Sequence, residues 1–128
     1  MRDVYLLFSH SLSDVQKDEL QKIWHVRESI HMPQELQKIW SNISPDLESL
    51  DELLAPVKSY LVSHAKKDDL VLIQGDFGAV YIMVNFAKSL GLTVVYATTK
   101  RIVQEYEEDG KMVKKSIFEH RRFREYGN

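Results

Sequence analysis

The chain has 128 residues, of which 44% are hydrophobic, and this size and composition favour one domain, residues 1–128, with a single core. A formal net charge of −2 gives no bulk attraction for a DNA duplex, and the lack of cysteine excludes disulfides and thiolate metal sites. Because no segment approaches a membrane span and the first residues have no signal-peptide pattern, we expect a cytoplasmic protein without a membrane partner.

The first half of the chain predicts two strands and three helical regions. Residues 4–8 form an apolar run typical of a buried strand, and the capping-box pattern of Ser13–Gln16 predicts a helix after it. Residues 25–30 predict a short second strand. A second helix is expected to begin near Pro33, and residues 50–65 predict a third helical region.

One hexapeptide, Glu-Leu-Gln-Lys-Ile-Trp, occurs twice in this half, at residues 19–24 and 35–40. The spacing of the two copies fits none of the common repeat architectures. We therefore interpret them as the ends of two similar amphipathic helices.

The most informative segment is a buried strand that runs directly into a glycine turn. Four apolar residues, 70–73, precede Gln74–Gly78, and an apolar helix pattern then continues to Leu90. The helix is expected to be the most buried one, because apolar residues occur on most of its sides. Its first amides would point toward the turn, where they favour phosphate.

The end of the chain changes character. Residues 93–97 predict another β-branched strand, which is expected to end at the polar sequence Thr98-Thr99-Lys100-Arg101. The turn signal Glu108-Asp109-Gly110 predicts a terminal β-hairpin, with a helix over residues 101–108 as the alternative.

This order of elements predicts a doubly wound α/β fold: a single Rossmann-like domain with a mostly parallel sheet and a C-terminal β-hairpin. Polar clusters follow three of the strands, at Ser9-His10, Gln74-Gly75-Asp76 and Thr98–Arg101. If these strands are parallel, the clusters converge on one edge of the sheet. The convergence predicts a binding site for a nucleotide-like ligand.

The residues of these clusters also have structural interpretations, which stay open. Gly75 and Gly78 allow close backbone approach to a phosphate, but they also fit an ordinary strand–helix turn, which Asp76 would cap. Lys100 and Arg101 suit a phosphodiester, or they are solvated bases. The histidine after the first strand, at position 10, is the best candidate for proton transfer, although such a residue often only packs.

The segment Phe118–Arg124 interleaves aromatic and basic residues. It could stack on bases and hold phosphates, or it could be an exposed hairpin strand with a solvated basic face. No metal site is expected, because the histidines lack ligand spacing, and no nucleophile elbow or catalytic cysteine is present.

Several segments together resemble a known group of proteins; they are Phe8–Leu12, Leu36–Trp40, Leu72–Ala79, Thr98–Arg101 and Phe118–Arg124. The group is the Csx-twenty family, small proteins of type III CRISPR systems that look like relatives of the CRISPR-associated Rossmann fold (CARF) ring nucleases. The resemblance covers nearly the whole chain. It implies a CARF-like homodimer that needs no cofactor, binds cyclic tetra-adenylate and ends the antiviral signal by cleaving it.

The chemistry that the resemblance implies is metal-independent. The ribose 2′-oxygen attacks the adjacent phosphorus in line and expels the 5′-oxygen, which leaves a 2′,3′-cyclic phosphate. Proton transfer is assigned to His10, and charge stabilisation to Arg101 with Lys100. The remaining ligand contacts are assigned to Ser9, Gln74, Gly75, Asp76, Phe77, Gly78, Thr98 and Thr99, with His120 and Arg121 as lid contacts from the hairpin.

Two other functions compete with this one. A sensor or sponge would bind the same cyclic oligoadenylate without cutting it. A mononucleotide- or phosphosugar-binding domain unrelated to CRISPR would bind no cyclic oligoadenylate.

Overall fold

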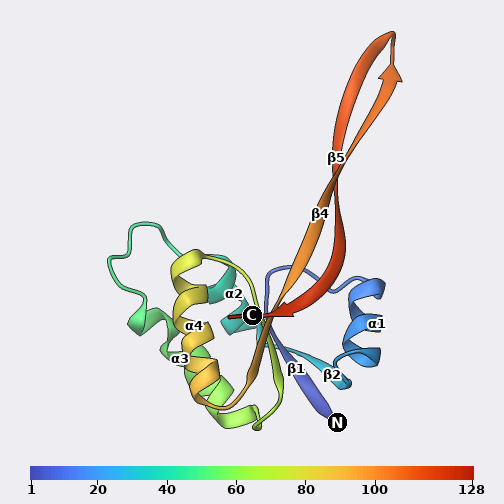
Figure 1. Ribbon diagram of the computed structural model, residues 1–128. Coiled ribbons are helices and arrows are strands. Elements are labelled where there is room, and N and C mark those ends of the chain that lie inside the picture. Colours follow the sequence, from blue (N-terminus) through green and yellow to red (C-terminus); the bar gives the residue numbers. More distant parts are fainter.

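A five-stranded sheet in the order β2-β1-β3-β4-β5 forms the centre of the computed structural model, which describes residues 1–128 (Figure 1). The first four strands are parallel and the fifth is antiparallel to β4. Their bounds are β1 Arg2–Leu7, β2 Val26–His31, β3 Leu70–Ile73, β4 Thr93–Glu108 and β5 Lys111–Glu125. The expected α/β fold with a mostly parallel sheet and a terminal hairpin is confirmed, and the alternative of a helix over residues 101–108 is wrong.

Helices cover both faces of the sheet (Figure 1). One face carries α1 alone, and the other carries the remaining three helices. Their bounds are α1 Asp14–Lys22, α2 Gln34–Ser41, α3 Asp51–His64 and α4 Phe77–Ser89. None of these helices combines the length and the apolar character needed to cross a membrane.

The alternation of side chains along the central strands explains why both faces can be covered. In β1, Leu6 packs with Leu20 of α1, while the next residue, Leu7, packs with the helices on the opposite face. All four residues of β3 are fully buried, which accounts for its continuous apolar sequence.

Strand β4 is much longer than its apolar residues indicate, and this corrects the expectation that it ends at Ala97. It pairs with β5 along its length up to the turn at Asp109 and Gly110. We call residues 100–119 the arm, because this part of the hairpin projects away from the body of the protein (Figure 1). Beyond Ala97, β4 remains a strand because its backbone pairs with β5, although no core packs against it there.

Helix α4 is also less buried than its composition predicts. Only Ala79, Met83 and Ala87 are buried, on the stripe that faces the sheet. Phe77 is 94% exposed and Tyr81 is 73% exposed. Compared with the other helices, α4 still has the smallest share of exposed residues, as expected, although no other element of the chain covers its outer stripe.

Candidate ligand site at the carboxyl edge of the sheet

The three polar clusters lie at one edge of the sheet. Strands β1, β3 and β4 are adjacent and parallel, and their registers, continued past the strand ends, place Ser9, Gly75 and Thr98 at equivalent positions. The chain leaves β1 toward β2 on one side and returns to β3 on the other. Such a reversal of strand order creates a crevice at the carboxyl ends of the strands, which is where α/β sheets commonly bind ligands.

The turn after β3 is held rigidly by Trp40 of α2. The indole Nε1 donates a hydrogen bond to the Gln74 carbonyl oxygen at 2.9 Å. A Cβ on Gly75 would come within 2.9 Å of the same indole nitrogen, so packing alone requires glycine here. The Gln74 side chain is also engaged, because its Oε1 accepts a hydrogen bond from the Ala97 amide at 2.7 Å.

The start of α4 presents open backbone beside an exposed aromatic ring. Asp76 caps the helix through its Oδ2, which accepts from the Ala79 amide at 3.0 Å. The first amides, those of Phe77 and Gly78, have no acceptor within the helix. A Cβ on Gly78 would meet only ordinary contacts, with the Asp76 carboxylate at 3.5 Å and Leu50 at 3.6 Å, so packing does not require this glycine.

The end of β1 contributes a hydroxyl and an imidazole. The Ser9 hydroxyl accepts a hydrogen bond from the Ser41 hydroxyl at 3.2 Å. His10 is exposed, and its ring lies edge-on against Phe8 with the ring centres 5.4 Å apart. Phe8 packs with the cluster on the α1 side, so the imidazole lies toward that face, whereas Ser9 contacts α2. Both residues are therefore accessible from the edge.

Strand geometry divides the cluster Thr98–Arg101 between the two faces of the sheet. Val94 packs on the α4 side and Val95 on the α1 side, so alternation places Thr98 and Lys100 on the α4 side. The Thr98 hydroxyl is occupied, because it donates to the backbone oxygen of Arg122 at 2.8 Å. Lys100 is thus the base that shares a face with the start of α4.

The other two residues of this cluster, Thr99 and Arg101, lie on the α1 side. The Arg101 guanidinium donates from Nε and Nη2 to the Ser116 hydroxyl, at 3.1 and 2.9 Å. Arg101 is exposed and lies along the arm. The structure therefore does not bring Lys100 and Arg101 onto one surface.

His120 and Arg121 do not lie together as lid contacts. The His120 side chain is 8% exposed, and its Nε2 lies 2.7 Å from Glu19 Oε1 of α1. Arg121 is exposed, pairs with Glu119 at 3.1 Å, and occupies the register shift where β5 has an extra residue. His120 anchors the base of the arm to the body instead of facing solvent.

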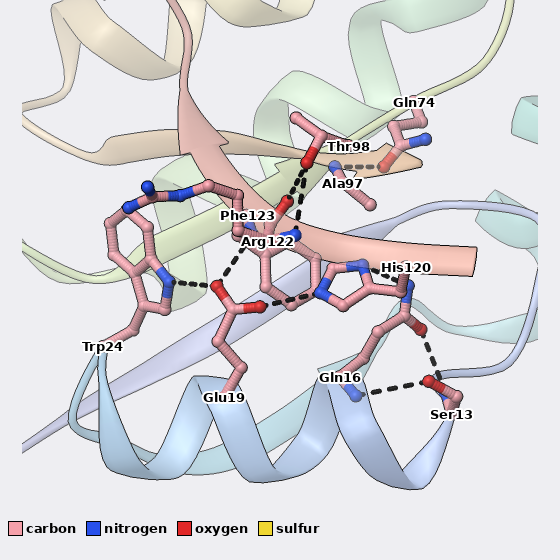
Figure 2. A network of polar contacts seen from close by, with 10 residues as sticks. All are labelled: Ser13, Gln16, Glu19, Trp24, Gln74, Ala97, Thr98, His120, Arg122 and Phe123. Carbon is pink, nitrogen blue, oxygen red and sulfur yellow. Dashed lines mark hydrogen bonds and ion pairs between the residues drawn. The ribbon is translucent and has the colours of Figure 1, made fainter. Parts of the chain in front are cut away.

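The capping box of α1 determines which nitrogen of His120 carries the proton (Figure 2). The Ser13 amide donates to Gln16 Oε1 at 2.9 Å, so the Gln16 amide nitrogen faces His120 Nδ1 at 3.4 Å. Because that nitrogen can only donate, Nδ1 is the acceptor. The proton is then on Nε2, which donates to Glu19.

Glu19 is the centre of this network, and local sequence patterns do not reveal it. Besides His120, its carboxylate accepts from the Phe123 amide at 2.7 Å and from the Trp24 indole at 3.1 Å (Figure 2). On the opposite face, the Tyr126 hydroxyl donates to the Ile73 carbonyl at 2.6 Å, and burial, with a smaller effect from Tyr96, raises the pKa of Tyr126. The C-terminal end of β5 is thus fastened to the body on both faces of the sheet.

Comparison with known proteins identifies relatives over nearly the whole chain. A family model described as "Uncharacterized protein MJ1673 family" matches residues 2–124. A protein of Methanocaldococcus jannaschii, "Uncharacterized protein MJ1673", is 50% identical over 126 residues, which cover 98% of each chain. No solved structure gives a significant match.

Proposed function

The chain belongs to the MJ1673 family, and we propose that it binds cyclic tetra-adenylate at the carboxyl edge of its sheet and cleaves it. In this reaction a ribose 2′-oxygen forms a bond to the adjacent phosphorus, and the bond to the 5′-oxygen breaks. The 2′-oxygen loses a proton and the 5′-oxygen gains one. Linear products with 2′,3′-cyclic phosphate ends would no longer activate type III CRISPR effectors.

The observation that carries this proposal is the set of groups near the start of α4, on one face of the sheet. Phe77, whose ring is exposed, is the first residue of α4, and strand alternation puts Lys100, at the root of the arm, on the same face of the sheet. Aromatic faces stack on nucleobases, while helix amides and ammonium groups hold phosphates. A nucleotide ligand uses all three groups.

Three parts of the proposed reaction have groups that can support them, and the proton lost by the 2′-oxygen would pass to water. The amides of Phe77 and Gly78, with Lys100, would hold the phosphate and stabilise the charge that develops on its oxygens. Stacking on Phe77 would fix the adenine, and with it the ribose, in line with the phosphorus. The exposed imidazole of His10 would supply a proton to the departing 5′-oxygen.

The ring itself favours a second copy of the chain as part of the site. Cyclic tetra-adenylate has two-fold symmetry, and a homodimer about the same axis would offer its edge residues twice. Each copy would then contact one half of the ring.

A turnover experiment tests the proposal. Radiolabelled cyclic tetra-adenylate in excess over the protein, with EDTA present, should be converted to linear di-adenylate with a 2′,3′-cyclic phosphate. Intact ring in a stoichiometric complex would establish the sponge in place of the nuclease. No binding at micromolar ring concentration would contradict both and favour the unrelated nucleotide-binding domain.

Phe77→Ala is expected to weaken binding of the ring about tenfold, because stacking of one base on an aromatic side chain contributes about 1–3 kcal/mol. Isothermal titration calorimetry measures the affinity. Tyr81→Ala is the matched control, since Tyr81 is also exposed but lies one helical turn farther from the edge. Equal losses in the two variants would show that the ring does not stack on Phe77.

A further inference from the structure

The arm presents a strand edge that the chain itself leaves unpaired. Strand β4 bonds to β3 only as far as Val95, after which the Gln74 side chain takes the Ala97 amide. From Thr98 to Glu108 the same edge has no partner, while the other edge pairs with β5. Two-stranded ribbons without further support are marginally stable in water, and open edges readily accept another strand.

The arm also exposes apolar side chains along its length. Tyr106 is 42% exposed, and Val103, Met112 and Phe118 are more exposed still. Its charges are balanced, with five bases and five acids between residues 100 and 119. This balance gives the arm no net attraction for a nucleic-acid backbone, and it favours a protein partner.

The charges along β4 are arranged so that the strand complements a reversed copy of itself. Bases stand at its root, Lys100 and Arg101, and acids stand near its tip, Glu107 and Glu108. In an antiparallel pairing of two β4 strands, the root of one copy lies opposite the tip of the other. Opposite charges then meet at both ends of the shared segment.

We propose that two copies of the chain join through the free β4 edges of their arms, and that Gln104 meets Gln104 of the second copy at the two-fold axis. Around this centre, the register pairs Arg101 with Glu107, Lys100 with Glu108 and Ile102 with Tyr106. Each of these pairs forms twice. The result is a four-stranded ribbon with strand order β5-β4-β4-β5.

Neighbouring registers fit less well. A two-fold axis perpendicular to the ribbon requires some residue to face its own copy, so the nearest alternatives are centred on Val103 or Glu105. Centring on Glu105 places two carboxylates opposite each other. Centring on Val103 pairs Arg101 with Glu105 but leaves Lys100 opposite Tyr106 and Glu107 opposite Thr99, so only one kind of charge pair remains.

The outer edge of β5 is less suited to antiparallel pairing with a second copy. Bases occur along its whole length, so a reversed copy would place like charges close together. These bases are Lys111, Lys114, Lys115, Arg121, Arg122 and Arg124. The charge pattern therefore selects the β4 edge.

Pairing of the arms would also orient the two bodies. Both arms leave from the carboxyl edge of the sheet, so the two edges would face one another across the ribbon (Figure 1). The two copies of Lys100 would lie about 26 Å apart along the ribbon, given a rise of about 3.3 Å per residue. The interface does not depend on the identity of the ligand.

Charge reversal and rescue test the interface in the full chain without ligand. Sedimentation velocity is expected to show a dimer for the natural sequence. Arg101→Glu alone and Glu107→Arg alone should each weaken association at least about tenfold, because each places like charges opposite one another. The double variant R101E/E107R should restore association to within about threefold, since the exchanged charges again match.

Single cysteines test the register, because the natural chain has none. Gln104→Cys should form an intermolecular disulfide under mild oxidation much faster than Glu105→Cys, whose partner in the register is Val103. Lys115→Glu, on the β5 edge, is the control for charge reversal and should leave association unchanged. A monomer at about 100 µM, or a dimer that Arg101→Glu leaves intact, would overturn the proposal.

Discussion

Cleavage of cyclic tetra-adenylate by His10→Ala is expected to be at least about tenfold slower than by the natural protein, with affinity for the ring unchanged to within a few-fold. His10 follows β1 at the carboxyl edge of the sheet, and its exposed imidazole lies against Phe8 on the α1 side. In the proposed mechanism His10 would exchange a proton with a reacting oxygen and would contribute little to holding the phosphates. Loss of the side chain should therefore reduce turnover more than binding.

Single-turnover kinetics with saturating protein measure this effect directly. His31→Ala is the matched control, because His31 is exposed at the end of β2, on the far side of β1 from the crevice. Its turnover should equal that of the natural protein. An unchanged rate for His10→Ala would remove His10 from the mechanism while leaving the binding site in place.

Glu19→Ala is expected to lower the free energy of unfolding by about 3 kcal/mol, because three donors lose their acceptor. Two of these donors, the His120 ring and the Phe123 amide, are buried or nearly so. For a chain of this length, the loss corresponds to a fall in Tm of about 10 °C. Urea titration and thermal melts followed by circular dichroism measure both quantities.

Asp18→Ala is the matched control, because it also removes a carboxylate from α1 but breaks none of the hydrogen bonds of the Glu19 network. Asp18 pairs only with Lys22 one turn along the same helix, and both side chains are more than half exposed. Such a pair contributes about 0.5 kcal/mol or less. If Glu19→Ala is no less stable than Asp18→Ala, the network does not hold the base of the arm.

The elements of the body could be predicted from the sequence because each has a local signal. The capping box at Ser13 and Gln16 is present in the structure as predicted, and the apolar run 70–73 is a strand buried on both faces. The convergence of three strand ends could also be predicted, because parallel strands place their carboxyl ends at one edge of the sheet. These features depend on short-range patterns and on one rule of sheet geometry.

The length of β4 and the exposure of α4 could not be predicted in the same way. Residues 98–108 mix polar and apolar types without a core to bury them, so their strand conformation comes from pairing with β5. An apolar stripe such as that of Phe77 and Tyr81 has the same composition whether it is covered or exposed. Composition alone therefore does not reveal which stripe remains open.

The repeated hexapeptide shows the same limit. The first copy lies at the end of α1 as expected, but the second makes up most of α2. Their indoles also have different partners: Trp24 donates to Glu19 in its own copy, and Trp40 donates to the distant Gln74 carbonyl. The two helices pack on opposite faces of the sheet. Identical sequence thus supports β5 on one side and the turn after β3 on the other.

Gln74 connects the turn after β3 to the start of the arm, because both its carbonyl and its side chain accept hydrogen bonds. Its carbonyl is held by α2, and its side-chain oxygen takes the place of a strand at the Ala97 amide. A bound molecule that competes for this oxygen would leave that amide without an acceptor, at a cost of about 1–3 kcal/mol. Occupancy of the crevice is thereby coupled to how firmly β4 is seated where it leaves the sheet.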